Sequence, residues 1–215
     1  MDHRVTLTFD NGPWPGVTER VLDLLASCGL RSTFFVVGRN LLRPGARELL
    51  QRAVAEGHWI GNHTWSHSIQ LGDPAAGEAV FEQEIEQTQR LIGDLSHADR
   101  LFRPYGAGGL LSRQLLSSAA VDSLRSGGFT CVLWSSVPRD WEPEVDWVER
   151  CLHDATTQTW PLVVLHDLPG CAVERLPELL DRLADREIEV VQELPPDCLP
   201  IRRGQVVLPI DDLSA

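Results

Sequence analysis

The stretch Val5-Thr6-Leu7-Thr8-Phe9-Asp10-Asn11-Gly12-Pro13 is the clearest strand-and-turn signal in this chain. It begins as an apolar, β-branched run and ends abruptly in Asn-Gly-Pro, which is typical of a tight turn. The pattern predicts a buried strand over about residues 4–9. Asp10 then falls where this strand meets its loop, and enzymes with α/β folds commonly place catalytic groups at that end of a strand.

Three later stretches also run from apolar residues into polar or ionisable ones, at residues 59–67, 101–105 and 162–167. The ends of these stretches supply His63 and His67, then Arg103, then His166. Since the carboxyl ends of parallel strands meet at the same edge of a sheet, we expect these side chains to converge with Asp10 on one site.

Strand-like runs alternate with helical patterns along the whole chain, and this predicts a parallel sheet with covering helices, either a barrel or an open doubly wound sheet. Residues 1–194 are expected to form one catalytic domain. The proline-rich residues 195–215 are expected to pack on it as an extended or hairpin-like tail. The predicted strands lie at residues 4–9, 32–37, 59–61, 101–103, 129–134, 162–165 and 187–191, and the helices at 17–28, 44–56, 75–95, 112–125 with Ser112 as N-cap, 144–155 and 173–186.

Composition narrows the class of protein. The formal net charge of −12 over 215 residues argues against nucleic acid or an anionic membrane surface as a partner. No apolar run approaches the roughly 20 residues of a membrane-spanning helix. The five widely spaced cysteines suit reduced thiols, and no signal-like segment precedes the first strand, so we expect a cytoplasmic protein. The sequence does not determine the oligomeric state.

His63 and His67 lie four residues apart, and on one helical turn they would face the same way. This spacing can place two imidazoles on one metal ion. Asp10 or its neighbour Asn11 is a natural source of a third ligand. The alternative is that the two histidines are polar residues of a loop.

Arg103 and His166 each follow an apolar run. An arginine at a strand end usually pairs with a carboxylate, and the proline and glycine after Arg103 could aim a backbone N–H into the site. Histidine is the usual general acid or base near neutral pH, and Asp140 or Asp167 could fix its tautomer. Each residue could instead have a purely structural role.

Four of the seven tryptophans lie in or beside these stretches. Their flat faces next to a polar site suit stacking on sugar rings, although tryptophans more often pack in a core. The four are Trp14, Trp65, Trp134 and Trp141, and we expect Trp14 and Trp65 among the substrate-binding residues.

Taken in order, five motifs resemble those of the polysaccharide deacetylase family, also called carbohydrate esterase family 4. The similarity covers about residues 4–192 and implies a distorted (β/α) barrel with about seven parallel strands. The motifs are Thr8-Phe9-Asp10-Asn11-Gly12-Pro13, His63-Thr64-Trp65-Ser66-His67, Arg103-Pro104-Tyr105, Asp140-Trp141 and Leu165-His166.

The resemblance implies a metal-dependent hydrolase that removes an N-acetyl group from an amino sugar or short oligosaccharide. In this reading Asp10 is the base that takes a proton from a metal-bound water, and Arg103 pairs with it. His63 and His67 are metal ligands, with Asn11 as the third. Zinc suits this ligand set, as do cobalt, nickel and manganese.

The remaining motifs imply the rest of the mechanism. The backbone N–H of Tyr105 would hold the oxyanion. His166 would act as the general acid that protonates the departing amine, with Asp140 tuning it. Trp141 and Leu165 would form the walls of an acetyl pocket.

The sequence departs from the family pattern at two positions. The common first motif has two consecutive aspartates, whereas here the second is Asn11, a neutral and weaker metal ligand. Val137 occupies the first acidic position of the fourth motif. Two alternatives therefore stay open: a cytoplasmic amidohydrolase of the same fold that acts on a small non-sugar amide or cyclic imide, and a carbohydrate-binding relative without catalysis.

Overall fold

The computed structural model describes residues 3–73 and 79–214 of the chain. Within this part, β1 to β7 are parallel strands, joined in the order β6-β1-β2-β3-β4-β5, and β7 pairs with β1. The strands are β1 (Arg4–Asp10), β2 (Thr33–Val36), β3 (Trp59–Asn62), β4 (Leu101–Phe102), β5 (Thr130–Cys131), β6 (Leu162–His166) and β7 (Glu189–Val191).

The sheet closes between β5 and β6. Ser136, which follows β5, forms a parallel bridge with Val163 of β6, and the Ser136 N–H donates to the carbonyl of Leu162 at 3.1 Å. Because β6 also pairs with β1 along its whole length, the strands form a distorted barrel. This agrees with the predicted fold class and strand number.

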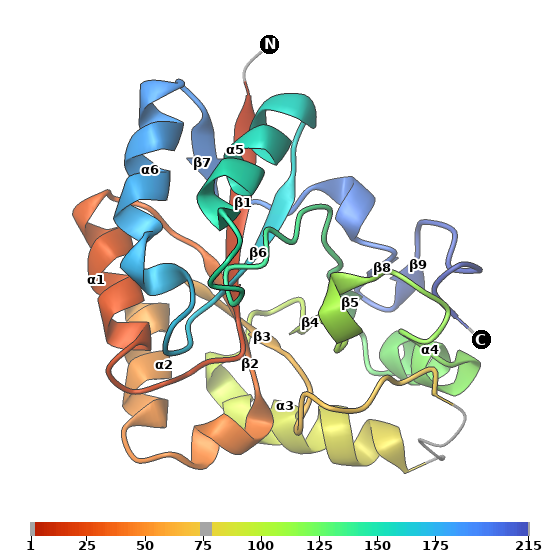
Figure 1. Ribbon diagram of the computed structural model, residues 1–215. Coiled ribbons are helices and arrows are strands. Elements are labelled where there is room, and N and C mark those ends of the chain that lie inside the picture. The colour runs from red at the N-terminus through yellow and green to blue at the C-terminus, as the bar shows by residue number, and fades with distance from the viewer. Residues whose placement is uncertain (1–2, 74–78, 215) are drawn as a thin grey trace.

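Helices cover the outside of the barrel, and Figure 1 shows α1, α5 and α6 beside the long strand β1. No helix of the described residues is long and apolar enough to cross a bilayer. The α-helices are α1 (Thr18–Ser27), α2 (Ala46–Ala55), α3 (Gln87–Ile92), α4 (Ser118–Ser126), α5 (Trp147–Thr157) and α6 (Leu176–Asp185). Short 3₁₀ segments are η1 (Gly38–Leu42), η4 (Gly93–Leu95), η5 (Ala107–Gly109), η6 (Ala172–Glu174) and η7 (Pro196–Cys198).

Two helix predictions need correction. The predicted helix 75–95 begins in residues 75–78, which lie outside the described residues, and its remainder is not uniform: a π-helical turn, η3 (Glu82–Glu86), precedes α3 and η4. The predicted cap Ser112 does not start a helix, because its hydroxyl accepts from the N–H of Gln114 in a turn. α4 starts later, where the hydroxyl of Ser117 accepts from the N–H of Ala120.

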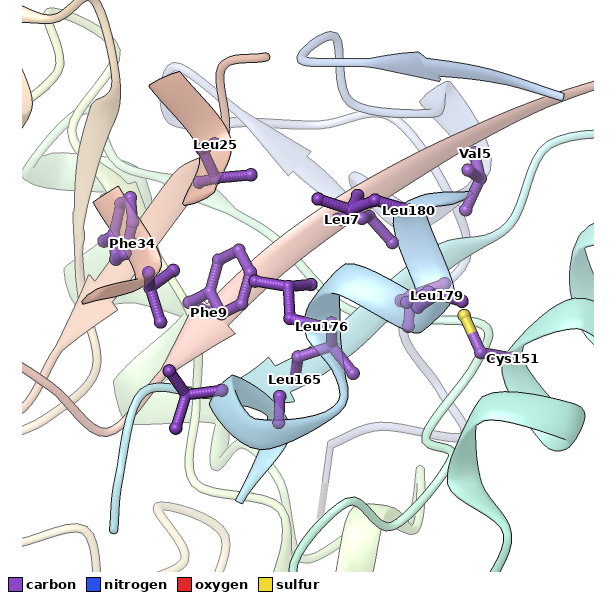
Figure 2. Close-up of a cluster of buried hydrophobic side chains, with 14 of the residues drawn as sticks. Val5, Leu7, Phe9, Leu25, Phe34, Cys151, Leu165, Leu176, Leu179 and Leu180 are labelled. Carbon is purple, nitrogen blue, oxygen red and sulfur yellow. The ribbon is translucent and has the colours of Figure 1, made fainter. Parts of the chain in front are cut away.

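Alternation along β1 separates the core from the barrel interior. Val5, Leu7 and Phe9 point outward into a buried cluster with helices α1 and α6, as Figure 2 shows. Side chains two residues apart share a face of a strand, so Thr8 and Asp10 point into the barrel. Burying each large apolar side chain contributes about 1.5–3 kcal/mol, so this cluster fixes the register that places Asp10 at the site.

The C-terminal tail contains a hairpin that extends the sheet beyond β5. Its strands β8 (Ile201–Arg202) and β9 (Gln205–Val206) form an antiparallel hairpin, and β8 pairs with β5 through Cys131 and Ile201. Ile201 is fully buried, in a second core cluster with Cys198 and Leu199. All five cysteines are free thiols, and Cys131, Cys151 and Cys198 are buried.

Candidate active site

The carboxyl ends of the strands surround a cavity of about 350 Å³. Asp10 ends β1 and His166 ends β6, and the two residues are direct partners in the parallel ladder. His63 and His67 follow β3, and Tyr105 follows β4. All five of these residues line the cavity, so the strand ends converge as the sequence predicts.

The Asp10 carboxylate is held at both oxygens. Oδ1 accepts from Nη1 of Arg103 at 2.7 Å, and Oδ2 lies 3.3 Å from Nε2 of His63. Asp10 is 3% exposed and Arg103 is fully buried. A carboxylate fixed between a permanent cation and an imidazole, at the edge of a cavity, is placed to accept a proton from a bound reactant.

Arg103 fills the barrel interior beneath Asp10. Its Nη1 also donates to the hydroxyl of Thr8 at 2.8 Å, while Nε donates to the carbonyl of Val132 at 3.3 Å. The guanidinium carbon lies 3.9 Å from the centre of the Phe35 ring. Burial lowers the pKa of Arg103 from its usual value, and the charge of Asp10 opposes that shift.

The histidine pair comes together through a bent loop, not the helical turn that the spacing suggested. Thr64 and His67 both have positive φ values, 64° and 50°, and these bends bring the rings of His63 and His67 to a centroid separation of 4.7 Å. Nδ1 of His63 lies 2.9 Å from the carbonyl oxygen of Arg103. If Nδ1 carries the proton, Nε2 is left as a lone-pair donor facing Asp10.

Both imidazoles are neutral over the physiological range. Burial lowers the pKa of His63 to about 3. Burial, followed by the charge of His63, lowers the pKa of His67 to about 3. Neutral imidazole is the form that binds metal ions.

Asn11 supplies the observation that tests whether the site suits a metal. Its backbone has φ of 77°, a conformation that asparagine tolerates better than most residues. Its Oδ1 atom is buried without a hydrogen-bond partner among the described residues, and the residue lines the same cavity as the histidines. An unsatisfied amide oxygen beside two neutral imidazoles is a donor set that a divalent cation would complete. No cluster of three His, Cys, Asp or Glu side chains suited to a metal occurs in residues 3–73 and 79–214.

His166 is paired with Asp140, which settles the choice between the two candidate carboxylates. Nδ1 of His166 lies 2.7 Å from Oδ1 of Asp140, whose Oδ2 accepts from the His166 N–H at 2.9 Å and from the Ala172 N–H at 3.0 Å. Burial opposes charge on His166, but the hydrogen bond and the negative charge of Asp140 outweigh it and raise the pKa of His166. His166 is therefore easier to protonate than a free imidazole, and because Nδ1 faces Asp140, Nε2 is the atom that can give a proton to a ligand in the cavity.

Asp167 has a different role, which the sequence did not reveal. Its Oδ2 accepts from the hydroxyl of Thr18 at 2.6 Å, and that hydroxyl accepts from the N–H of Trp14 at 2.7 Å. A Cβ at Gly12 would lie 2.0 Å from the same carboxylate oxygen. Asp167 thus anchors the turn that carries Asn11. Burial raises the pKa of Asp167 to about 7.

The cavity walls differ from the prediction at two positions. Leu165 lies outside the cavity, in the core cluster of Figure 2, because it points to the opposite face of β6 from His166. Val164, two residues before His166, takes the position predicted for Leu165. Trp65 packs against Gly38 and also lies outside the cavity.

Three aromatic predictions are placed as follows. Trp141 lines the cavity, and its ring meets the His166 ring edge-on at 4.9 Å. Trp134 also lines it and donates from Nε1 to the carbonyl of Gly109 at 2.8 Å. Trp14 lines a neighbouring cavity.

Tyr105 packs its ring edge-on against the ring of His67, with the ring centres 4.5 Å apart. The backbone N–H of Tyr105 has no acceptor in the part of the chain that the structure describes.

Comparison with known proteins identifies what the site resembles. Residues 1–124 match the model of the polysaccharide deacetylase family. A chitooligosaccharide deacetylase of Sinorhizobium fredii is 32% identical over 197 residues, covering 89% of this chain and 84% of that protein.

Solved structures give the same result. Peptidoglycan deacetylase PdaC from Bacillus subtilis superposes with a TM-score of 0.69 at 28% identity, covering 89% of this chain and 88% of that one. A family 4 acetyl xylan esterase from Clostridium thermocellum, in complex with a cobalt ion, gives 0.70 at 26% identity, covering 87% of each chain. These neighbours point to a divalent metal.

Proposed function

This chain belongs to the polysaccharide deacetylase family, and on that premise we propose that it is a hydrolase that removes the N-acetyl group from an amino sugar or short oligosaccharide. One observation carries the proposal. Asp10 and His166 are ladder partners on adjacent parallel strands and line one cavity, and each has its own buried charged partner. A base and an acid are thereby fixed on neighbouring strands, about 4.8 Å apart at the backbone.

Asn11, His63 and His67 would hold the divalent cation, and zinc fits two imidazoles and an oxygen. When bound, the cation supplies Lewis acidity that polarises the amide carbonyl and makes water a better nucleophile. The low pKa values of both histidines keep their lone pairs available at neutral pH.

The protein's own groups carry the proton transfers. Asp10, held by Arg103, takes a proton from the attacking water as the C–O bond forms. The Tyr105 N–H, which has no acceptor in the described residues, donates to the oxygen that gains negative charge. His166 then gives its proton to the amine nitrogen as the C–N bond breaks, and Asp140 stabilises the charged imidazole beforehand.

The apolar part of the cavity wall supports a small acyl group as the group removed. Val164 and Trp141 present apolar surface beside His166, where the acetyl methyl group would lie. A second cavity of about 750 Å³ adjoins the first and shares Asn11 and His67 with it. Together they offer more room than a small amide or cyclic imide requires, which favours an oligosaccharide.

Acetate release from tetra-N-acetylchitotetraose by the zinc- or cobalt-loaded protein tests the proposal. We expect turnover that falls by at least about a hundredfold in Asp10→Asn and in His166→Gln, because each removes one proton-transfer group. Full activity in Asp10→Asn would contradict the assigned mechanism. Turnover of a hydantoin or simple acetamide, with none of the tetrasaccharide, would replace the substrate class.

A further inference from the structure

The second cavity has a chemical character of its own. It lies between the turn after β1 and the segment that follows β2, and its volume of about 750 Å³ is within the usual range of about 300–1,000 Å³ for ligand sites. Arg39 and Arg43 both line it. No acidic side chain lines it among the described residues.

Arg39 and Arg43 bring two positive charges to one cavity of a chain whose net charge is −12. Some surface arginines, such as Arg20 and Arg175, pair with carboxylates at 2.8–3.0 Å, whereas Arg202 makes no ion pair among the described residues. Within residues 3–73 and 79–214, neither Arg39 nor Arg43 makes an ion pair. A positively charged cavity has thus been left unneutralised next to the catalytic one, although the protein has 31 acidic residues.

Arg43 is also held in place. Its guanidinium carbon lies 3.7 Å from the centre of the Trp14 ring, and its Nε donates to Oδ1 of Asn40 at 3.2 Å. Asn40 in turn donates from Nδ2 to the backbone carbonyl of Asn11 at 2.7 Å. The terminal N–H groups of Arg43 have no acceptor among the described residues, so a fixed fork of donors faces the cavity.

A guanidinium fork that is stacked and fixed suits the two oxygens of an oxyanion, and it loses little conformational entropy on binding. Asn11 and His67 line both cavities, so a ligand in the second cavity is continuous with one in the first. An extended ligand whose acetamido group meets Asp10 would therefore place its neighbouring unit beside Arg43.

We infer that this second cavity binds an anionic substituent, a carboxylate or a sulfate ester, carried by the sugar unit next to the one that is deacetylated. That the ligand is a saccharide rests on the proposed function. That it is anionic rests on Arg39, Arg43 and the absence of acidic lining in the described residues.

Binding assays separate the two parts of this inference. Three tetrasaccharides serve as probes: tetra-N-acetylchitotetraose, its 6-carboxylate and its 6-sulfate, each titrated by calorimetry at 50 mM NaCl. We expect both anionic probes to bind about tenfold more tightly than the neutral one, which corresponds to about 1.4 kcal/mol. A carboxylate that binds more tightly than the sulfate identifies a sugar acid as the source, and the reverse order identifies a sulfate ester.

Variants show where the preference originates. Arg43→Gln should reduce the anion preference to about twofold or less, and Arg43→Lys, which keeps the charge but loses the fork, should retain part of it. Arg202→Gln is the matched control, because Arg202 is exposed and lies on β8, away from both cavities. In 0.5 M NaCl the preference of the unmodified protein should shrink, because the arginines are exposed.

Equal binding of the neutral and anionic probes, or a preference that survives in an Arg39→Gln/Arg43→Gln double variant, would overturn the inference. Acetate release from the neutral probe by the unmodified protein is measured separately. A preserved anion preference without acetate release overturns the proposed function alone, and acetate release without a preference overturns the inference alone.

Discussion

Replacing Arg103 by methionine should destabilise the protein strongly. Arg103 is fully buried and donates to Asp10, Thr8 and the carbonyls of Val132 and Leu133. Losing the charged hydrogen bond to Asp10 alone costs about 1.5–3 kcal/mol. Because the Asp10 charge would also remain buried without its partner, the total cost should be about 3–5 kcal/mol.

The double variant Arg103→Met/Asp10→Asn isolates the pair. It removes both charges together, so neither is left unpaired in the barrel. We therefore expect it to be less destabilised than the sum of the two single variants, by about 2 kcal/mol. Arg125→Met, which breaks an exposed pair with Asp122, should change stability by no more than about 0.5 kcal/mol.

Urea unfolding followed by tryptophan fluorescence measures these differences. For a domain of this size, the loss in Arg103→Met should lower the melting temperature by about 6–20 °C. The reasoning fails if Arg103→Met loses less than about 1 kcal/mol, or if the effects of the two single variants are simply additive. Either result would mean that Arg103 and Asp10 do not form the buried pair seen here.

Three further predictions concern the site. Asp140→Asn should lower activity by about 10²–10⁴-fold and move the high-pH limb of the pH–rate profile to lower pH. Asp140 raises the pKa of His166, so without it the imidazole loses its proton at a lower pH, and an unchanged pH–rate profile would contradict this. Leu165→Ala should lower the free energy of unfolding in urea by about 2–5 kcal/mol with little change in KM, because Leu165 lies in the core cluster. Val164→Phe should raise KM for the tetrasaccharide, because Val164 lines the cavity, and the opposite pattern would mean that Leu165 forms the cavity wall. Asn11→Asp should bind zinc about tenfold more tightly in chelator competition, because the added charge favours the cation; equal affinity would show that this side chain is not a ligand.

The order of elements and the convergence of strand ends could be predicted from the sequence. Apolar runs alternating with helical periods have few other folded arrangements, and parallel strands deliver their ends to one edge. The sequence alone could therefore place four residues that lie far apart in the chain in one site: Asp10, His63, Arg103 and His166.

The predictions were wrong where the local sequence does not show which way a side chain or a loop points. Leu162-Val163-Val164-Leu165 is apolar throughout, because both faces of β6 are buried, so nothing in it shows which residues point inward. The loop between His63 and His67 depends on positive φ at two residues that are not glycine, and at Thr64 this conformation is rare because the side chain is β-branched. Asp167 contacts the turn at Gly12 although the two residues are 155 positions apart. A local sequence pattern cannot predict such a contact.

The hairpin of β8 and β9 affects the order in which parts of the chain can fold during synthesis. Cys131 of β5 pairs with Ile201 of β8, so this edge of β5 stays without its antiparallel partner until about 70 more residues have been made. Domains fold as units as they leave the ribosome, and contacts between distant residues form late. A nascent chain that ends after β7 should therefore remain sensitive to protease, and addition of residues 192–206, which include the hairpin, should protect it.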